Sequence, residues 1–259
     1  MPNSNLEQLI ATAALLRPML GDLVFVGGAV TSLLVTDEGA GLPRTTLDVD
    51  AIAEITSYAE YAAFGERLRA LGFSEATSEG APLCRWVHSG MILDVMPLDE
   101  KILGFSNRWY RAAMQAATTH PLFQDLKIRV VTAPYFLATK IEAFKDRGRG
   151  DFFASHDLED LIFVIDGRST IVEEVQTETP LFREYLRTEI RIVGEAGIHR
   201  RPTWLLAARR CQSGKNRHSA STIASGRLFL IWKGSTGAGP ANLRQRREGG
   251  YCARMRGDE

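Results

Sequence analysis

The chain has 259 residues, 45% of them hydrophobic, so it can bury the core of one large domain or of two small ones. Its net charge is zero, yet residues 1–197 hold 18 Lys or Arg and 28 Asp or Glu, a balance of −10, whereas residues 198–259 hold 13 and 3, a balance of +10. The acidic body therefore gives no strong electrostatic signal for RNA binding, and the break in charge needs a separate explanation.

The cysteines and the N-terminal sequence bear on the cellular compartment. Cys84, Cys211 and Cys252 form no CxxC or Cys/His cluster, which argues against a disulfide framework or a zinc knuckle. Residues 1–16 lack the basic start and the long apolar stretch of a signal peptide, and no run is long enough to cross a bilayer. We therefore expect a cytoplasmic protein without a membrane partner.

Hydrophobic periodicity predicts alternating helices and strands in the first part of the chain. Apolar residues recur at helical spacing over residues 6–20, 29–36 and 58–73. A short apolar run at residues 23–28 predicts a buried strand that ends at two glycines. Residues 46–55 alternate apolar and polar side chains, as a strand with one buried face does.

Three further elements follow: a β-hairpin over residues 84–97, a strand and then a helix over residues 128–148, and a helix over residues 155–167. The hairpin is expected to turn near Ser89 and Gly90. Pro134 should begin the first of these helices, because proline fits the first helical turn. Ser155 is a good N-cap for the second helix, and Gly167 should end it.

Two carboxylates share one face of the strand predicted at residues 46–55. Asp48 and Asp50 are two positions apart, so on a strand they point the same way, with backbones roughly 6.6–7 Å apart. Such a pair repels itself unless water solvates it or a cation lies between the carboxylates. A solvated strand face is one interpretation, and a metal site is the other.

A third carboxylate, Asp94, stands alone among apolar residues on a later predicted strand. Burial disfavours the charged form of such a side chain, and a metal shared with Asp48 and Asp50 would offset the penalty. The alternative is that Asp94 faces solvent on an edge strand.

Gly27 and Gly28 end the first predicted strand and open the next helix. Without side chains, their backbone N–H groups can approach phosphate oxygens near the positive end of a helix. By itself, a Gly-Gly pair is usually only a turn. Its position ahead of the three aspartates makes phosphate binding the more specific hypothesis.

This order of a strand, Gly-Gly, a helix, DxD on the next strand and a third aspartate on a later one resembles the nucleotidyltransferase superfamily with the DNA polymerase β-like fold. The resemblance implies that the glycines hold the triphosphate of a nucleotide and that the three acids hold two Mg²⁺ ions. Asp48 and Asp50 would then hold both ions, and Asp94 would hold the catalytic one.

The stretch KIEAFKDRGRGDFFASHDLEDL, residues 140–161, narrows the resemblance. It is similar to the C-terminal signature of the AbiEii/AbiGii-type (MenA-like) toxin nucleotidyltransferases, which has a helical lysine, an Arg-rich loop and an acidic helix start. The matching residues are Lys140, Arg147, Arg149, Asp157 and Asp160. The resemblance implies that Lys140 meets phosphate as a point charge and that Asp157 orients it. A solvated lysine and an acid that complements a helix N-terminus are the structural alternatives.

The resemblance spans residues 20–195 and has departures. Ala29 follows the glycines where many members carry Ser, Thr or Tyr, so a hydroxyl contact to phosphate would come from Thr31 or Ser32. Arg44, ahead of the DxD strand, could contact phosphate or be solvated as a loop arginine.

We expect an α/β (α+β) fold: a polymerase-β-like nucleotidyltransferase core with a short mixed sheet over residues 1–125, and a helical subdomain over residues 126–197. The predicted reaction moves a nucleoside monophosphate from an NTP to a hydroxyl on an RNA end such as that of tRNA, on a protein or on a small molecule. The resemblance further implies the toxin of a toxin–antitoxin or phage-defence system, with an antitoxin protein as partner. A non-catalytic binding protein on the same fold is the main alternative. A metal-dependent phosphohydrolase is a third, although the histidines lack the spacing it needs.

Residues 198–259 allow two interpretations. One is a basic arm that binds nucleic acid. The other, which we favour, is a change of reading frame near residues 196–198. Residues 198–218 can be back-translated with permitted codons, and the same DNA read one nucleotide later encodes a peptide with a Pro/Gly turn and an Asp-capped helix. We then expect the tail to be unstructured and dispensable for activity. The genomic DNA decides, since the second interpretation requires that such a peptide be encoded past residue 197.

Overall fold

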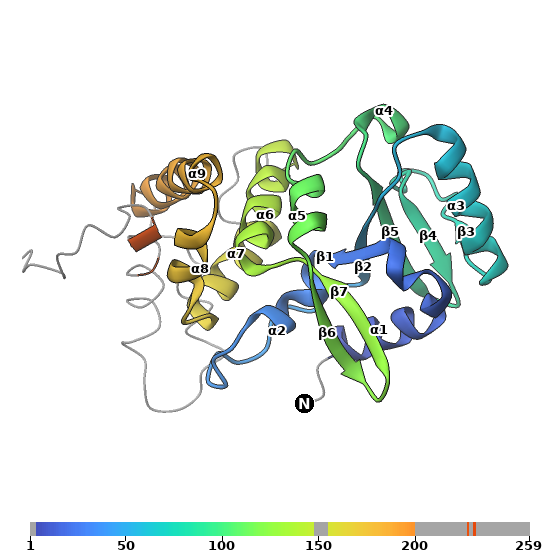
Figure 1. Cartoon of the computed structure of the whole chain (residues 1–259), viewed down its shortest axis with the longest axis horizontal. Coiled ribbons are helices and arrows are strands. Elements are labelled where there is room, and N and C mark those ends of the chain that lie inside the picture. The colour runs from blue at the N-terminus through green and yellow to red at the C-terminus, as the bar shows by residue number, and fades with distance from the viewer. Residues whose placement is uncertain (1–3, 148–154, 200–226, 228–229, 232–259) are drawn as a thin grey trace, which may run out of the picture.

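A computed structural model describes residues 4–147, 155–199, 227, 230 and 231 of the chain (Figure 1). Within these residues, seven strands form one sheet: β1 (Leu23–Val26), β2 (Asp48–Ala53), β3 (Ser74–Glu75), β4 (Arg85–His88), β5 (Met91–Pro97), β6 (Thr118–Phe123) and β7 (Leu126–Val130). The strand order is β3-β4-β5-β2-β1-β7-β6. The pairs β2–β5 and β1–β7 are parallel and the other neighbours are antiparallel, so the expected mixed sheet of an α/β protein is confirmed.

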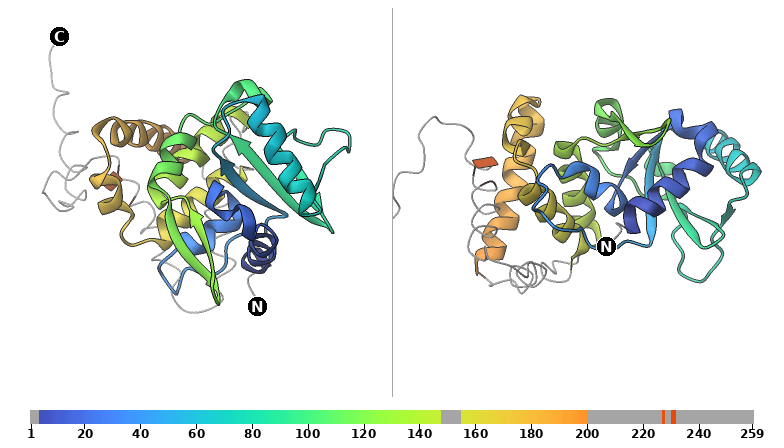
Figure 2. Two further views of the ribbon diagram at one scale, coloured as in Figure 1. Left: turned by 45° about the vertical axis from the view of Figure 1, so that its right-hand side comes forward. Right: turned by 90° about the horizontal axis from the view of Figure 1, so that it is seen from below.

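The helical elements are α1 (Ser4–Leu15), η1 (Arg17–Asp22), η2 (Gly28–Val30), α2 (Thr31–Leu34), α3 (Tyr58–Ala70), α4 (Glu100–Leu103), α5 (Tyr110–Ala116), α6 (Ala133–Arg147), α7 (His156–Gly167), α8 (Ile171–Thr177) and α9 (Pro180–His199). Figure 1 shows α6, α7, α8 and α9 grouped on one side of the molecule and α3 at the opposite end, and Figure 2 shows the same separation from two other directions. In the described ranges, no helix combines the length and the hydropathy needed to cross a membrane.

Two predicted helices are shorter than their apolar patterns. The helix expected over residues 6–20 ends at Leu15, and Pro18 lies in the 3₁₀ turn η1, because proline supplies no N–H for a continuing α-helix. The helix expected over residues 29–36 is a single 3₁₀ turn followed by the four-residue α2. A helix this short has only a weak dipole. It therefore gives little support to the hypothesis that the glycines bind phosphate near the positive end of a helix.

The hairpin of β4 and β5 turns as predicted. Ser89 and Gly90 have φ angles of 47° and 83°, the left-handed values that a two-residue type I′ turn requires. This turn fixes the register that pairs Arg85 with Asp94. On its other edge β5 runs parallel to β2, in the register that pairs Asp50 with Asp94. Arg85, Asp94 and Asp50 therefore lie side by side on three neighbouring strands.

The sheet extends past the domain boundary expected at residue 125. The β6–β7 hairpin turns at residues 124 and 125, and β7 pairs with β1 in the middle of the sheet. A cut at residue 125 would remove a strand from the core, so the helical part begins after Val130. Most of the tail, residues 200–226, 228–229 and 232–259, lies outside the described residues, and both interpretations of it stay open.

Candidate active site

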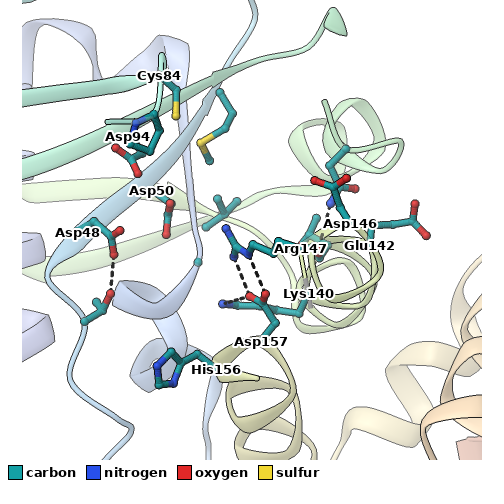
Figure 3. Close-up of a pocket in the computed structure, with 18 of the residues that line it drawn as sticks. Asp48, Asp50, Cys84, Asp94, Lys140, Glu142, Asp146, Arg147, His156 and Asp157 are labelled. Carbon is teal, nitrogen blue, oxygen red and sulfur yellow. Dashed lines mark hydrogen bonds and ion pairs between the residues drawn. The ribbon is translucent and has the colours of Figure 1, made fainter. Parts of the chain in front are cut away.

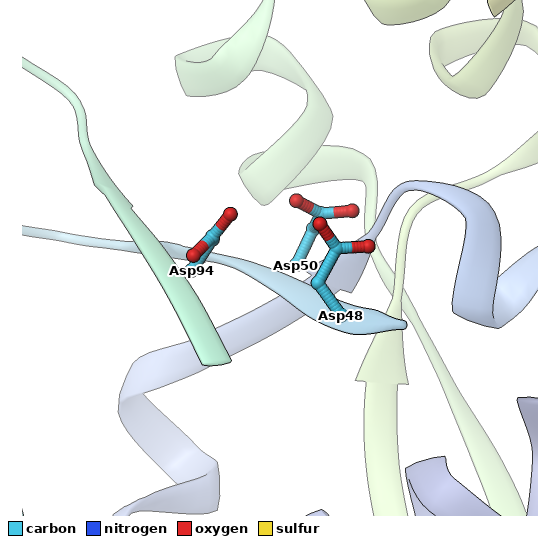
Figure 4. A group of neighbouring side chains, drawn as sticks. All are labelled: Asp48, Asp50 and Asp94. Carbon is cyan, nitrogen blue, oxygen red and sulfur yellow. The ribbon is translucent and has the colours of Figure 1, made fainter. Parts of the chain in front are cut away.

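Three carboxylates meet at one end of β2 and β5, as Figure 4 shows. Each of Asp48, Asp50 and Asp94 offers an oxygen within 4.8 Å of the others, which is close enough for the group to hold a metal ion. The alternation of β2 explains the arrangement, because Val49 and Ala51 are fully buried and leave the aspartates on the opposite face. Asp94 is only 6% exposed, so it does not face solvent on an edge strand.

Helix α1 fixes the loop that leads into β2. The buried Asn5 side chain donates to the Arg44 carbonyl oxygen (2.8 Å) and accepts from the Thr46 backbone N–H (3.1 Å). Thr46 in turn donates its hydroxyl to Asp48 Oδ1 at 2.6 Å. These bonds satisfy polar groups that are buried or nearly so, and they limit the rotation of the Asp48 carboxylate.

An arginine from β4 lies against two of the three carboxylates. Arg85 donates Nε to Asp94 Oδ1 (2.8 Å) and Nη2 to Asp94 Oδ2 (2.7 Å), and the same Nη2 is 3.1 Å from Asp48 Oδ2. The hydrogen bonds to Asp94 hold the pKa of Arg85 above its ordinary value. The guanidinium therefore carries a full positive charge in the middle of the acidic group.

Asp50 has a different environment. Within the described part of the chain, no lysine or arginine forms an ion pair with it at 4 Å or less. Burial raises the pKa of Asp50 to about 7, repulsion from Asp48 and Asp94 adds to the rise, and Lys140 and Arg147 oppose it. Asp50 is the member of the group whose negative charge is least compensated by the protein.

Gly27 makes room for Asp50. Its φ of 70° and ψ of −163° lie in a region that is essentially restricted to glycine, and a Cβ added there would be 1.9 Å from Asp50 Oδ2. Gly28 instead faces Arg44 and Thr46. The glycine pair thus ends β1 so that the backbone passes directly beneath a carboxylate.

Opposite the acids, Figure 3 shows Lys140 and Arg147 of α6 beside Asp157 of α7. Together with Arg44, from the loop before β2, and Asp160 of α7, these residues define what we call the basic wall. Lys140 Nζ bonds to Asp157 Oδ1 (3.1 Å) and Asp160 Oδ2 (2.7 Å). Arg147 makes two bonds to Asp157 at 2.9 Å, and Arg44 makes two to Asp160 at 2.8 Å. These three cations and two carboxylates sum to a net charge of +1, and Glu142, Lys145 and Asp146 of α6 also line the cleft.

Lys140 is neither solvated nor free to meet a ligand without rearrangement, since it is 6% exposed and lies between two carboxylates. Burial alone raises the pKa of Asp157, but the hydrogen bonds from Arg147 and Lys140 outweigh it and the net shift is downward. Asp157 therefore stays ionised and holds the Lys140 and Arg147 side chains in place. Its position in the first turn of α7, after the Ser155 cap, suits the helix dipole as well.

Replacing Lys140 by methionine should lower the free energy of unfolding by about 1–3 kcal/mol. This is less than the 3–5 kcal/mol typical of breaking a buried ion pair, because Asp157 keeps Arg147 and Asp160 keeps Arg44. Urea unfolding at neutral pH measures the change. Lys145→Met is the matched control on the same helix, since Lys145 is 44% exposed and its two ion pairs should contribute less than about 1 kcal/mol. Equal losses in the two variants would contradict the role assigned to burial.

The acids and the basic wall border one cleft of about 1150 Å³. Of the residues predicted from sequence, it brings together Gly27, Arg44, Asp48, Asp50, Asp94, Lys140 and Asp157. Gly28, Thr31 and Ser32 do not line it. The hydroxyls of Thr31 and Ser32 are buried without a hydrogen-bond partner among the described residues, so neither hydroxyl is placed to contact a phosphate in the cleft. Arg149 lies outside the described residues.

Arg85, Asn5 and Thr46 are site residues that sequence reasoning missed. For Arg85 a signal existed, because a two-residue turn at Ser89 and Gly90 sets the hairpin register and places residue 85 opposite residue 94. For Asn5 no local signal exists, since its partners are about 40 residues away along the chain.

A scan with models of protein families found no match, and a search of curated proteins found none. A search of solved structures returned the crystal structure of an antigenic nucleotidyltransferase-like protein from Paracoccidioides brasiliensis, with a TM-score of 0.42 and 21% sequence identity. The match covers 63% of this chain and 77% of that chain. At this similarity, function has to be inferred from the residues of the cleft.

Proposed function

We propose that this chain is a metal-dependent nucleotidyltransferase, which moves a nucleoside monophosphate from an NTP to a hydroxyl group of an acceptor. The observation that carries the proposal is the arrangement of opposite charges across one cleft. Three carboxylates within 4.8 Å of one another line the same cleft as Arg44, Lys140 and Arg147. Phosphoryl and nucleotidyl transfer need this pairing, because a triphosphate has to be held by cations while its reacting phosphorus is neutralised and positioned.

The donor set fits Mg²⁺. The three acids supply only oxygen ligands, which Mg²⁺ prefers. We assign two ions to Asp48, Asp50 and Asp94. Bound Mg²⁺ would neutralise charge on the phosphate oxygens and make the acceptor hydroxyl easier to deprotonate.

The chain's own residues position the nucleotide. Arg44 and Arg147 line the cleft, and Asp160 and Asp157 occupy the Nε and Nη2 donors of their guanidinium groups, so the Nη1 donors are the ones left for phosphate oxygens. Lys140, held by Asp157, supplies a point charge behind them. The acceptor oxygen forms a bond to the α-phosphorus, the bond from that phosphorus to the leaving pyrophosphate breaks, and the hydroxyl proton passes to solvent beside the carboxylates.

The resemblance of Lys140, Arg147 and Asp157 to the AbiEii/AbiGii-type signature supports a narrower proposal, that the chain is an enzyme of this type. On that basis the protein acts in the cytoplasm as the toxin of a toxin–antitoxin or phage-defence pair. Its acceptor is then a tRNA end, a protein side chain or a small molecule, and an antitoxin protein is its partner. A non-catalytic protein of the same fold would bind NTP in this cleft without releasing pyrophosphate.

Each of the four NTPs, labelled at the α-phosphate, is incubated with the protein and Mg²⁺, with total tRNA, cellular protein or aminoglycosides as acceptors. We expect label in one acceptor class, and a loss of at least about 100-fold in Asp48→Asn, since ~3 kcal/mol of lost transition-state stabilisation gives that factor. Expression of the wild-type chain, but not of Asp48→Asn, should arrest growth of a host. NTP binding without transfer to any class would favour the non-catalytic alternative.

A further inference from the structure

Arg85 stands where a cation shared by Asp48 and Asp94 would be held. Its Nη2 is 2.7 Å from Asp94 Oδ2 and 3.1 Å from Asp48 Oδ2, while Nε closes a bidentate contact with Asp94. The fold itself sets the position of Arg85, because the register of the β4–β5 hairpin places its backbone directly opposite Asp94. It is 25% exposed and lines the cleft.

We propose that Arg85 is an internal counterion, which neutralises Asp48 and Asp94 when no metal is bound and which has to leave them for a metal ion to bind. The inference rests on the proposed function, because it takes the three acids as metal ligands. Arg85 then controls how tightly the three acids bind a metal ion, which is a role separate from holding the substrate.

Electrostatics gives the direction of the effect. A guanidinium within hydrogen-bond distance of two carboxylates repels a divalent ion that approaches the same oxygens. Arg85 therefore lowers the affinity of the acids for a free metal ion. Arg85 does not neutralise the negative charge of Asp50, which forms no ion pair with the described residues.

A nucleotide changes this competition. Once displaced, the Arg85 guanidinium remains in the cleft, where phosphate oxygens offer it a new bidentate partner. The metal and the triphosphate should consequently bind together, each favouring the other, whereas the metal alone binds weakly. By reciprocity, NTP should tighten Mn²⁺ binding by the same factor as Mn²⁺ tightens NTP binding.

The test measures Mn²⁺ binding by calorimetry, without NTP, to the full chain and to Arg85→Met and Arg85→Gln. We expect both variants to bind Mn²⁺ at least about tenfold more tightly than the wild type, since a neutral side chain no longer competes. Arg85→Lys keeps the charge and should stay near the wild type. Arg69→Met is the matched control, because Arg69 also contacts two carboxylates, Glu66 and Glu75, but does not line the cleft.

Thermal unfolding gives a second readout that does not depend on activity. Without metal, Arg85→Met and Arg85→Gln should unfold at a lower temperature than the wild type, and saturating Mn²⁺ should raise their Tm by more than it raises that of the wild type. Weaker or unchanged Mn²⁺ affinity in both variants would overturn the counterion role and leave the metal site standing. No Mn²⁺ binding by the wild type or by any variant would overturn the metal site and the inference together.

Discussion

Asp50→Asn should abolish nucleotidyl transfer and yet make the protein more stable at pH 8 when metal is removed. The expected loss of activity is about a thousandfold or more, because ~4 kcal/mol of lost charge stabilisation in the transition state corresponds to that factor. The gain in stability has a separate cause, which is that the native state forces Asp50 into a cluster of like charges with no ion-pair partner among the described residues.

The pH dependence follows from the direction of the pKa shift. The native pKa of Asp50 is about 7, raised from 3.8, so between these values the native protein keeps a proton that the unfolded chain releases. The contribution of Asp50 to the stability of the wild type therefore falls as pH rises from about 4 to about 7. Asparagine removes this loss, and the variant should gain up to about 4 kcal/mol at pH 8, less at pH 5 and nothing near pH 3.

Asp94→Asn is the informative comparison, since it should lose activity to a similar degree but lose stability as well. Its carboxylate accepts two hydrogen bonds from Arg85, and breaking this mostly buried pair should cost about 1–3 kcal/mol. Urea unfolding with EDTA at pH 5 and pH 8, together with the NTP transfer assay, measures both effects. Equal changes in stability for Asp50→Asn and Asp94→Asn would show that Arg85 does not distinguish the two acids.

Much of the sheet could be predicted because its signals are local. The alternation around Asp48 and Asp50 defines β2, and the turn at Ser89 and Gly90 defines the β4–β5 hairpin. The β6 strand was not predicted, since it contains Pro121 and lies at the edge of the sheet with exposed side chains. The first helix is shorter than predicted because Pro18 prevents it from continuing, whereas the apolar spacing continues past Leu15.

The candidate site could be predicted in its residue types but not in its pairings. From sequence alone, the carboxylates of the site are expected to repel one another unless water or a cation lies between them. The structure separates them, because Arg85 neutralises Asp94 and Asp48 while Asp50 has no such partner among the described residues. Likewise, Lys140 is recognisable as a site residue, but its burial between Asp157 and Asp160 depends on how α6 packs against α7.

Gly27→Ala adds one methyl group and should strongly lower both the stability and the transfer activity of the protein. The backbone at Gly27, with φ of 70° and ψ of −163°, is essentially closed to other residues, and forcing alanine into it costs about 1–3 kcal/mol. The new methyl group would also lie 1.9 Å from Asp50 Oδ2, so the carboxylate has to move away from Asp48 and Asp94. We expect a loss of about 3 kcal/mol or more in stability and a loss of transfer activity comparable to that of Asp50→Asn.

Two variants separate the strain from the clash. Gly21→Ala is the control for adding a methyl group, because nothing lies within 4 Å of its Cβ position and its φ is not in the left-handed range, so its stability should change by less than about 1 kcal/mol. Combining Gly27→Ala with Asp50→Gly removes the side chain that the methyl group meets but not the backbone strain. The double variant should therefore be less destabilised than the sum of the two single changes, with the difference measuring the contact between residue 27 and the carboxylate. If the two losses in the free energy of unfolding simply add, the glycine is needed for its backbone conformation and not for the space it leaves for Asp50.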